Sequence, residues 1–600
     1  MGRIKFLPVY PAFPETFWSL RKAVRYLPGK KASMPPTGLL TVAAMLPEDQ
    51  FEVRRVIDLN VEPLTDRQLE ETDYVFTSTM VIQELSHNEV IARAHEHGKR
   101  VVAGGPFPTS FPERNVDADY IVAGEAELTL ASFLEDLLNG TAQKIYTERS
   151  AAGRTRVQLN ANGKPTLTST PIPRWDLIDL RKYGSAAIQY SRGCPFNCDF
   201  CDITKLFGRE PRTKTPEQMG AEFDAIFDWG YRGPLMVVDD NFIGNKNVRQ
   251  LLPYLTEWQR ARGFPFKLFT EASMNLGWDA NEDIRKAMVE ARFNSVFVGI
   301  ETDDEESLKR MGKGQNTKMP ALEAVRNIQR SGLEVMGGFI IGCDGEKPGT
   351  AQRLYNFIQE AGILISMVGL LAPLKGTRLY ERLAKEGRLR EDFRGDNTHH
   401  LAFGFVPEQN EEDLLKGYKE LLRKLYDSEN YFKRARVLRE NLGPQPPSGR
   451  LNLEGITAFA RLLGNKTFAK GGWEMLKYLG ETMIRRPSYF PEVVAQAIKL
   501  DHFNTLTTEM LRADAYIPHT ETLYEQFLAK AQRMRDKYGE NIREASKAIS
   551  QAARRVIDKA EKRYSQLHRD FREGAERALN NLRERMNGEI ERYGASASSG

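Results

Sequence analysis

The 600-residue sequence has few cysteines and no long apolar segment. Four cysteines cannot form a disulfide framework, and three of them fall within eight positions, which indicates metal or redox chemistry in a reducing compartment, by default the cytoplasm. The longest apolar run, residues 361–372, is shorter than the ~20 residues that a membrane span needs. The first residues lack the basic segment, apolar core and cleavage site of a signal peptide, so we expect no secretion.

The sequence also lacks a large excess of charge of either sign. Lys and Arg total 85 against 81 Asp and Glu, a net charge of +4 that falls short of the concentrated positive charge typical of nucleic-acid binding. We therefore expect no nucleic-acid partner. Hydrophobic residues make up 41%, so the chain can bury real cores, and its length suggests three to five domains, or fewer if one is a large barrel.

Residues 1–140 alternate short apolar runs with helical patterns. Strands are predicted around residues 51–59, 73–80, 99–105 and 118–124, with a helix over 81–98. This order predicts an α/β, doubly wound, Rossmann-like parallel sheet whose ligands bind beyond the carboxyl ends of the strands. Residues 141–185 carry few periodic signals and are interpreted as a linker.

A second alternating series begins at residue 186. Six strand candidates before residue 410 predict a partial (β/α)6 barrel, with its chemistry at the carboxyl ends of the strands. Residues 411–510 are predicted to form a helical extension. Residues 511–600 have the spacing of one amphipathic helix, or of two packed together, and their mildly basic polar faces suit either packing on the protein itself or contact with a membrane surface.

Cys194, Cys198 and Cys201 form a C-x3-C-x2-C motif directly after a predicted strand. A structural zinc site would need a fourth ligand, and the other cysteine, Cys343, is distant in sequence and is interpreted as a small buried residue. Three thiolates can instead bind three irons of a 4Fe–4S cluster and leave the fourth iron open to a chelating ligand. Three unpaired buried cysteines are the remaining alternative.

The motif resembles that of the radical S-adenosylmethionine (radical SAM) superfamily. The resemblance implies that the open iron chelates S-adenosylmethionine, whose cleavage gives a 5′-deoxyadenosyl radical. It also implies a set of contacts to this cosubstrate at later strand ends: Phe200, Asp239, Asp240, Asn241, Glu271, Glu301, Gly338 and Ile341. For these residues core packing, a helix N-cap or a structural salt bridge is the alternative interpretation.

Segments of the first domain are similar to the cobalamin-binding domain of one radical SAM class. The residues implied to line the corrin are Thr79, Met80, Gly104, Gly105, Gly124 and Glu125. Phe107 replaces the histidine of the common GGPHPT motif, and no D-x-H-x-x-G motif is present, so any cobalamin would bind without a protein histidine on cobalt. The histidines of the predicted helix, His87, His95 and His97, fit surface or packing roles. The alternative is a sheet kept only for packing or dimerisation.

Residues 371–440 resemble the radical SAM group that includes hopanoid C-2 methylases, with Thr377 and Tyr380 in register and His399 and His400 in a loop that could cap the barrel. These resemblances imply a cobalamin-dependent methyltransferase acting on an unactivated carbon of a hydrophobic or natural-product substrate, a small molecule or lipid. They also imply an electron donor such as flavodoxin or ferredoxin. The alternatives are a radical cyclase, oxidase or rearrangement enzyme without methyl transfer, and a non-enzymatic cluster-binding protein. The sequence identifies no catalytic residue.

Overall fold

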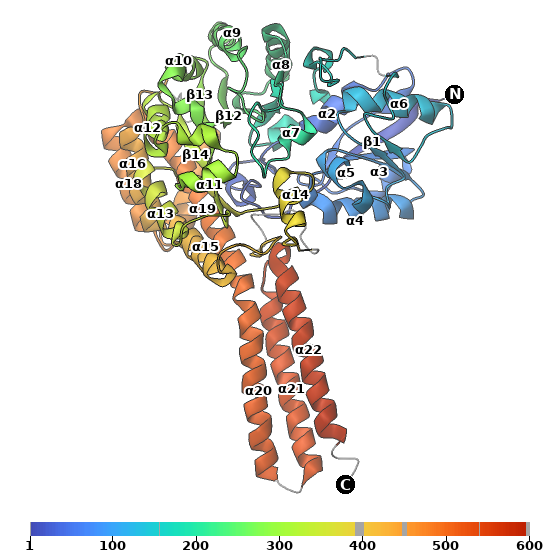
Figure 1. Cartoon of the computed structure of the whole chain (residues 1–600), viewed down its shortest axis with the longest axis vertical. Helices are drawn as coiled ribbons and strands as arrows, with labels where there is room; N and C mark the ends of the chain where they lie inside the picture. The colour runs from blue at the N-terminus through green and yellow to red at the C-terminus, as the bar shows by residue number, and fades with distance from the viewer. Residues whose placement is uncertain (1, 155–156, 391–400, 447–452, 539–540, 596–600) are drawn as a thin grey trace. The chain divides into compact units, whose positions relative to one another are not determined.

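The computed structural model describes residues 2–154, 157–390, 401–446, 453–538 and 541–595. The chain divides into two compact units, Met1–His502 and Phe503–Gly600 (Figure 1). The first contains two parallel sheets and a set of helices, and the second is helical. Each is considered by itself.

The N-terminal sheet is parallel and has helices on both faces. Its strands are β1 (Ile4–Tyr10), β2 (Phe51–Val53), β3 (Ile57–Asp58), β4 (Tyr74–Ser78), β5 (Arg100–Gly104), β6 (Tyr120–Val122) and β7 (Ile145–Tyr146), in the order β2-β1-β4-β5-β6-β7 with β3 also on β1. One core contains Val9, Val75 and Ile91, and another contains Phe6, Phe76 and Phe133. Because successive residues of a strand face opposite sides, the two cores lie on opposite faces, and the doubly wound fold is confirmed.

The helices of this sheet are α2 (Thr37–Ala44), α3 (Asp66–Glu70), α4 (Glu84–Glu96), α5 (Pro106–Ser110) and α6 (Ala126–Leu138). Two details differ from the sequence prediction. The strand expected over 51–59 is broken into β2 and β3, with the exposed Arg54 and Arg55 between them. The strand β7 pairs with β6 inside the segment interpreted as a linker, because a two-residue strand leaves no periodic signal.

All six strands predicted for the second sheet are present, parallel and in consecutive order. They are β8 (Ala186–Ile188), β11 (Gly233–Val237), β12 (Phe266–Ala272), β13 (Phe293–Glu301), β14 (Glu334–Ile341) and β15 (Ser366–Leu370). The connecting helices are α8 (Pro216–Asp228), α9 (Val248–Ala261), α10 (Glu282–Glu290), α12 (Ala321–Arg330) and α13 (Thr350–Ala361), several of which Figure 1 shows around the strands. β8 and β15 are the two end strands of the sheet and do not pair with each other, so the barrel is partial.

Helices follow the barrel, as predicted. They are α14 (Arg378–Lys385), α15 (Glu411–Leu425), α16 (Ser428–Asn441), α17 (Leu453–Lys466), α18 (Gly472–Arg485) and α19 (Phe490–Asp514). α15 and α16 pack on α13, and Tyr418 and Tyr426 donate hydrogen bonds to the β15 carbonyls of Val368 (3.0 Å) and Ser366 (2.7 Å). The helical extension therefore covers the last strand of the barrel.

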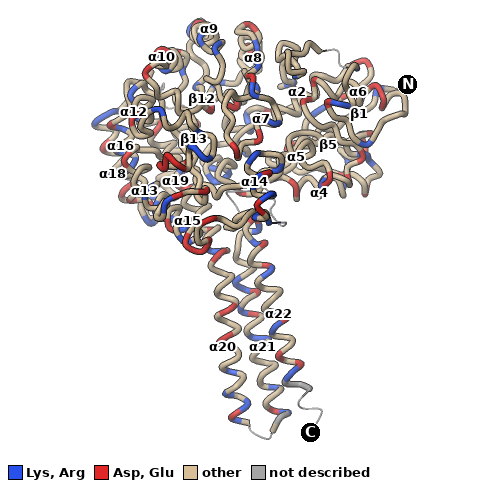
Figure 2. The backbone as a smooth tube through the Cα atoms, in the orientation of Figure 1, with Lys and Arg blue, Asp and Glu red and all other residues tan. Residues whose placement is uncertain are grey.

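The second unit contains the end of α19, from Phe503, and a bundle of three long helices, α20 (Tyr516–Tyr538), α21 (Ile542–Ser565) and α22 (Arg572–Ala595). Its core includes Phe527, Ile549, Leu579 and Met586. The prediction of one or two helices was wrong in number. The apolar residues keep the same 3.6-residue spacing before and after each turn between helices, so the spacing does not show where one helix ends. Figure 2 shows residues of both charge signs distributed along the three helices. Among the described residues, no helix combines the length and the apolarity that crossing a bilayer requires.

Candidate functional site

The cysteine loop lies at the carboxyl end of the first barrel strand, between β9 (Ser191–Arg192) and α7 (Ile203–Leu206). Cys194, Cys198 and Cys201 are free thiols and partly buried. Burial raises the pKa of all three, that of Cys201 to about 12. Asn241 Nδ2 lies 3.7 Å from Cys194 Sγ, and Gln315 Nε2 lies 3.9 Å from Cys198 Sγ, both as donors. Thiolates in this loop need a bound cation, and the amide donors suit sulfur that carries negative charge.

Within the described ranges, no three His, Cys, Asp or Glu side chains gather as they would around a single metal ion. The donor set itself, three thiols on one short loop with no fourth protein ligand in the motif, fits a cluster that keeps one iron for another ligand.

The acidic segment after β11 holds the start of the cysteine loop. Asp239 is buried, and its carboxylate accepts hydrogen bonds from the Tyr190 N–H (2.8 Å) and the Ser191 hydroxyl (2.6 Å). Asp240 accepts one from the Gly193 N–H (2.8 Å), directly before the first cysteine. These bonds position the loop, a role that the sequence interpretation missed. The alternative interpretation of Asp239, an exposed acid at a helix N-cap, is wrong because its side chain is buried.

Three carboxyl groups gather beside this loop: Asp239, Asp240 and Glu271. Burial, together with repulsion from neighbouring carboxylates, raises their pKa values to about 7, 6 and 7 respectively. None of the three makes an ion pair with another described residue. Such a trio is stabilised by a positively charged ligand, because an added cation favours the ionised forms. The ammonium and sulfonium groups of S-adenosylmethionine have the required charge.

Glu301 is committed to a buried ion pair. Its carboxylate lies 2.5 Å from Lys313 Nζ, and its backbone has φ 69° at an irregularity in the pairing of β13 with β14. Burial lowers the Lys313 pKa, but Glu301 and Cys198 outweigh that effect and raise it. Lys313 Nζ also lies 5.9 Å from the centre of the Phe200 ring. The structure thus places a cation beside the cysteine loop that the sequence, with no motif around residue 313, did not reveal.

Two predicted residues on β14 are tightly packed. A Cβ at Gly338 would lie 3.0 Å from Phe297 Cζ on the neighbouring strand, so a larger residue there would displace the Phe297 ring. Ile341 is buried near the end of the same strand. Cys343 is buried as predicted, with its Sγ 3.3 Å from Met311 Sδ.

The glycines of the N-terminal sheet lie at one edge, because Ser78 is in register with Gly104, and Gly104 with Val122. Gly105 has φ 94°, and a Cβ there would lie 2.8 Å from the Thr79 amide nitrogen. Thr79 is buried, and no described group bonds its hydroxyl. At the same edge Met80 is 48% exposed and Gly124 has φ 87°. An accessible backbone edge with an unsatisfied hydroxyl fits a ligand that approaches closely.

The histidines near this edge belong to packing and surface contacts. His87 is fully buried, its Nε2 lies 3.0 Å from Asn115 Oδ1, and burial lowers its pKa to about 4. Phe107 is also buried, 6.2 Å from the His87 ring. His95 and His97 contact Asp119 (2.9 Å) and Asp66 (3.2 Å).

A buried ion-pair network joins the sheet edge to the cysteine loop. Arg192 Nη1 lies 2.9 Å from Glu125 Oε2 and 2.9 Å from Glu127 Oε1. Arg212 Nη2 lies 2.9 Å from Glu125 Oε1. The side chains of Glu125, Glu127 and Arg212 are at most 5% exposed. Because Arg192 precedes Cys194 by two residues, the network couples the predicted cobalamin edge to the cluster loop.

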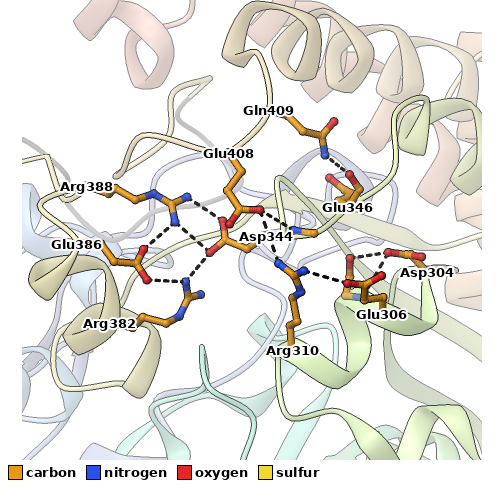
Figure 3. A network of polar contacts seen from close by, with 12 residues as sticks. Asp304, Glu306, Arg310, Asp344, Glu346, Arg382, Glu386, Arg388, Glu408 and Gln409 are labelled. Carbon is orange, nitrogen blue, oxygen red and sulfur yellow. Dashed lines mark hydrogen bonds and ion pairs between the residues drawn. The ribbon is translucent and has the colours of Figure 1, made fainter.

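A second polar network lies at the end of β14 (Figure 3). Asp344 pairs with Arg382 (2.6 Å) and Arg388 (2.7 Å), and these arginines hold its carboxyl pKa below its usual value although burial opposes them. Glu408 accepts a hydrogen bond from the Gly345 N–H (2.9 Å). The segment after α14 is thereby fixed across the strand end.

Thr377 is the N-cap of α14 and accepts a hydrogen bond from the Tyr380 N–H (3.2 Å). The structure thus gives Thr377 a structural role and brings neither residue into contact with the cysteines. His399 and His400 lie outside the described residues.

Comparisons with known proteins agree with this arrangement. Residues 188–358 match the Radical SAM superfamily, residues 31–134 the B12 binding domain and residues 377–516 a domain of unknown function, DUF4070. The chain is 41% identical to an uncharacterized methyltransferase of Synechocystis and 36% identical to the hopanoid C-2 methylase of Rhodopseudomonas palustris, each over 72% of this chain and 78% of the relative. A methyltransferase of Kitasatospora setae, solved with cobalamin and a 4Fe–4S cluster, has a similar fold, with TM-score 0.51 and 15% identity over 83% of this chain and 99% of that one.

Proposed function

The chain belongs to the radical SAM superfamily, among its cobalamin-dependent methyltransferases, and from that premise we propose that it methylates an unactivated carbon of an apolar natural product or lipid. The comparisons confirm the family and the carbon-methylating activity that the sequence predicted. They also confirm the three predicted cofactors, which are a 4Fe–4S cluster, S-adenosylmethionine and cobalamin. The apolar substrate is proposed because the hopanoid C-2 methylase, whose name denotes methylation of a lipid class, is 36% identical.

One observation carries the chemistry: a loop of three thiols lies beside three raised-pKa carboxyl groups that form no ion pair with a described residue. When bound, the cluster and S-adenosylmethionine supply a radical that removes hydrogen from carbon, and cobalamin supplies the methyl group. Cys194, Cys198 and Cys201 would hold the cluster. Asn241 and Gln315 would donate hydrogen bonds to its sulfur ligands.

The carboxyl groups would orient S-adenosylmethionine by its positive charge. Glu271 is the strongest candidate for direct contact, because Asp239 and Asp240 already accept hydrogen bonds from the backbone of the cysteine loop. Lys313 would add positive charge beside the cluster, fixed in place by Glu301. Phe200, Gly338 and Ile341 would shape the adenine side.

The sheet edge formed by Thr79, Met80, Gly104, Gly105 and Gly124 would receive the corrin. Since Phe107 has no ligating atom and His87 is buried against Asn115, we propose that no histidine of this domain binds cobalt. For Glu125 we propose a role other than the predicted contact with the corrin. Its carboxylate is committed to Arg192 and Arg212, so it would position the cysteine loop rather than contact the corrin.

The partners and compartment follow from the same chemistry. A low-potential donor of the flavodoxin or ferredoxin class would reduce the cluster. The four free thiols suit a reducing compartment such as the cytoplasm.

The test is anaerobic turnover with S-adenosylmethionine that carries a deuterated methyl group, with polycyclic lipids as candidate substrates. We expect a product heavier by one labelled methyl group, together with S-adenosylhomocysteine and 5′-deoxyadenosine. Formation of 5′-deoxyadenosine with an unmethylated product would instead establish the cyclase, oxidase or rearrangement alternative. Methylation confined to polar substrates would contradict the apolar substrate class.

A further inference from the structure

The helix α18 and the turn before it expose large apolar side chains. Phe468 is 99% exposed, Trp473 74% and Ile484 85%, with Met483 at 55%. Trp473, Lys477 and Ile484 recur at helical spacing and therefore share one face of α18. The opposite face is buried through Met475, Tyr478, Leu479 and Thr482. Side chains of this size on one exposed face are typical of a surface that binds a partner.

Lys477 lies on this face, with Lys470 just before α18 and Arg485 at its last position. Lys470, Lys477 and Arg485 are exposed and make no ion pair with a described residue. The two acidic residues of α18 are paired with α16: Glu474 lies 3.7 Å from Arg436, and Glu481 lies 2.8 Å from Arg436 and 3.4 Å from Arg439. The face therefore combines aromatic and aliphatic side chains with uncompensated positive charge. That combination complements the interface of an anionic bilayer.

The helices α20–α22 are less suited to the same role, although their sequence pattern also admits contact with a membrane surface. Their large apolar residues are used in the core of the bundle, where Phe527, Ile549 and Leu579 are buried. Ile517 is the one large hydrophobic residue of these three helices that is exposed in the described part of the unit. The basic residues there alternate with acidic ones (Figure 2).

We propose that the α18 surface, formed by Phe468, Lys470, Trp473, Lys477, Met483, Ile484 and Arg485, docks on an anionic lipid bilayer. The aromatic and aliphatic side chains enter the interfacial layer, and the basic side chains contact lipid phosphates. This inference rests on the apolar substrate of the proposed function, because docking gives the enzyme access to molecules that partition into lipid. Its physical basis, the exposed face, is independent of methyl transfer.

The test is vesicle flotation of the full-length holoenzyme, with phosphatidylcholine vesicles that contain or lack phosphatidylglycerol. We expect binding to the anionic vesicles that weakens with salt. The triple variant F468S/W473S/I484S should bind at least about tenfold more weakly, because three apolar side chains no longer enter the interface. The control L85S/V116S removes two apolar side chains that are 67% and 62% exposed elsewhere, and should bind like the wild type.

Equal binding by the wild type and the triple variant, or binding by neither, would overturn the proposal. So would a concentration-dependent dimer that the triple variant abolishes, since the face would then belong to a second copy of the chain. Methyl transfer to substrate in detergent micelles separates the two ideas. The triple variant should retain it there, whereas vesicle binding without methyl transfer by the wild type would contradict the proposed function and leave docking intact.

Discussion

The cysteine loop and the edge of the N-terminal sheet differ in the groups that they present to a ligand. The loop presents side chains: three thiols, two amide donors and a group of carboxyls. The sheet edge presents backbone at Gly104, Gly105 and Gly124, which are partly exposed. A site built from side chains is lost when a substitution changes a ligand atom, as sulfur to oxygen. A site built from backbone is lost when a substitution adds a side chain where there was none. The network of Glu125, Arg192 and Arg212 connects the two regions.

The largest expected effect is the loss of the cluster in C201S, which should leave the corrinoid site unaffected. C201S removes one of three cluster ligands, so the reconstituted protein should lose nearly all of its iron and its visible charge-transfer absorbance. Corrinoid content after reconstitution should stay unchanged. C343S, which alters the buried cysteine outside the motif, is the matched control and should keep both cofactors. Iron retained by C201S at the wild-type level would contradict the three-thiolate site.

E125Q should affect both regions together. Removing the carboxylate leaves Arg212 buried without an acidic partner and weakens the hold on Arg192, which should lower the free energy of unfolding of this unit by about 3 kcal/mol. Denaturant unfolding measures this, and cluster and corrinoid content should both fall. E48Q, at a pair with Arg174 in which Glu48 is 80% exposed, should change stability by less than about 1 kcal/mol. Equal effects of the two substitutions would show that the network does not couple the regions.

G105A should weaken corrinoid binding about tenfold or more and leave the cluster intact. The added methyl group would meet the Thr79 amide, and alanine at φ 94° is strained. Gly98 also has positive φ (66°) but open space around it, so G98A tests the strain alone. Equilibrium binding of hydroxocobalamin measures the difference. A corrinoid affinity equally reduced in both variants would indicate strain rather than close approach.

The last prediction is a pH dependence of stability that arises from Glu271. Burial raises the pKa of Glu271 from 4.5 to about 7, so the folded state binds its proton more tightly than the unfolded state does. The stability of the cofactor-free protein relative to E271Q should therefore decline as pH rises from about 4.5 to 7. S-adenosylmethionine should reduce this slope in the cluster-loaded wild type. Thermal unfolding of both proteins across this range measures it, and a slope of opposite sign would contradict the assignment.

Much of the barrel was predictable, because its strands are short, mainly apolar runs that alternate with helical patterns in the sequence. The cysteine motif was equally visible, since its chemistry depends on residue type and spacing. The network around Glu125 was not, because Arg192 and Arg212 lie 67 and 87 positions away and the fold alone brings them together. Lys313 was missed for the same reason. The short strands β3 and β7, two residues each, fall below any periodic signal.

The most direct test of the cluster assignment is electron paramagnetic resonance of the anaerobically reconstituted, reduced enzyme before and after addition of S-adenosylmethionine. Three cysteine ligands leave one iron able to bind the amino and carboxylate groups of this molecule, so the g-values of the cluster should change on addition. A spectrum that remains the same at saturating S-adenosylmethionine would mean that every iron is already ligated by the protein, which would contradict a cluster held by Cys194, Cys198 and Cys201 alone.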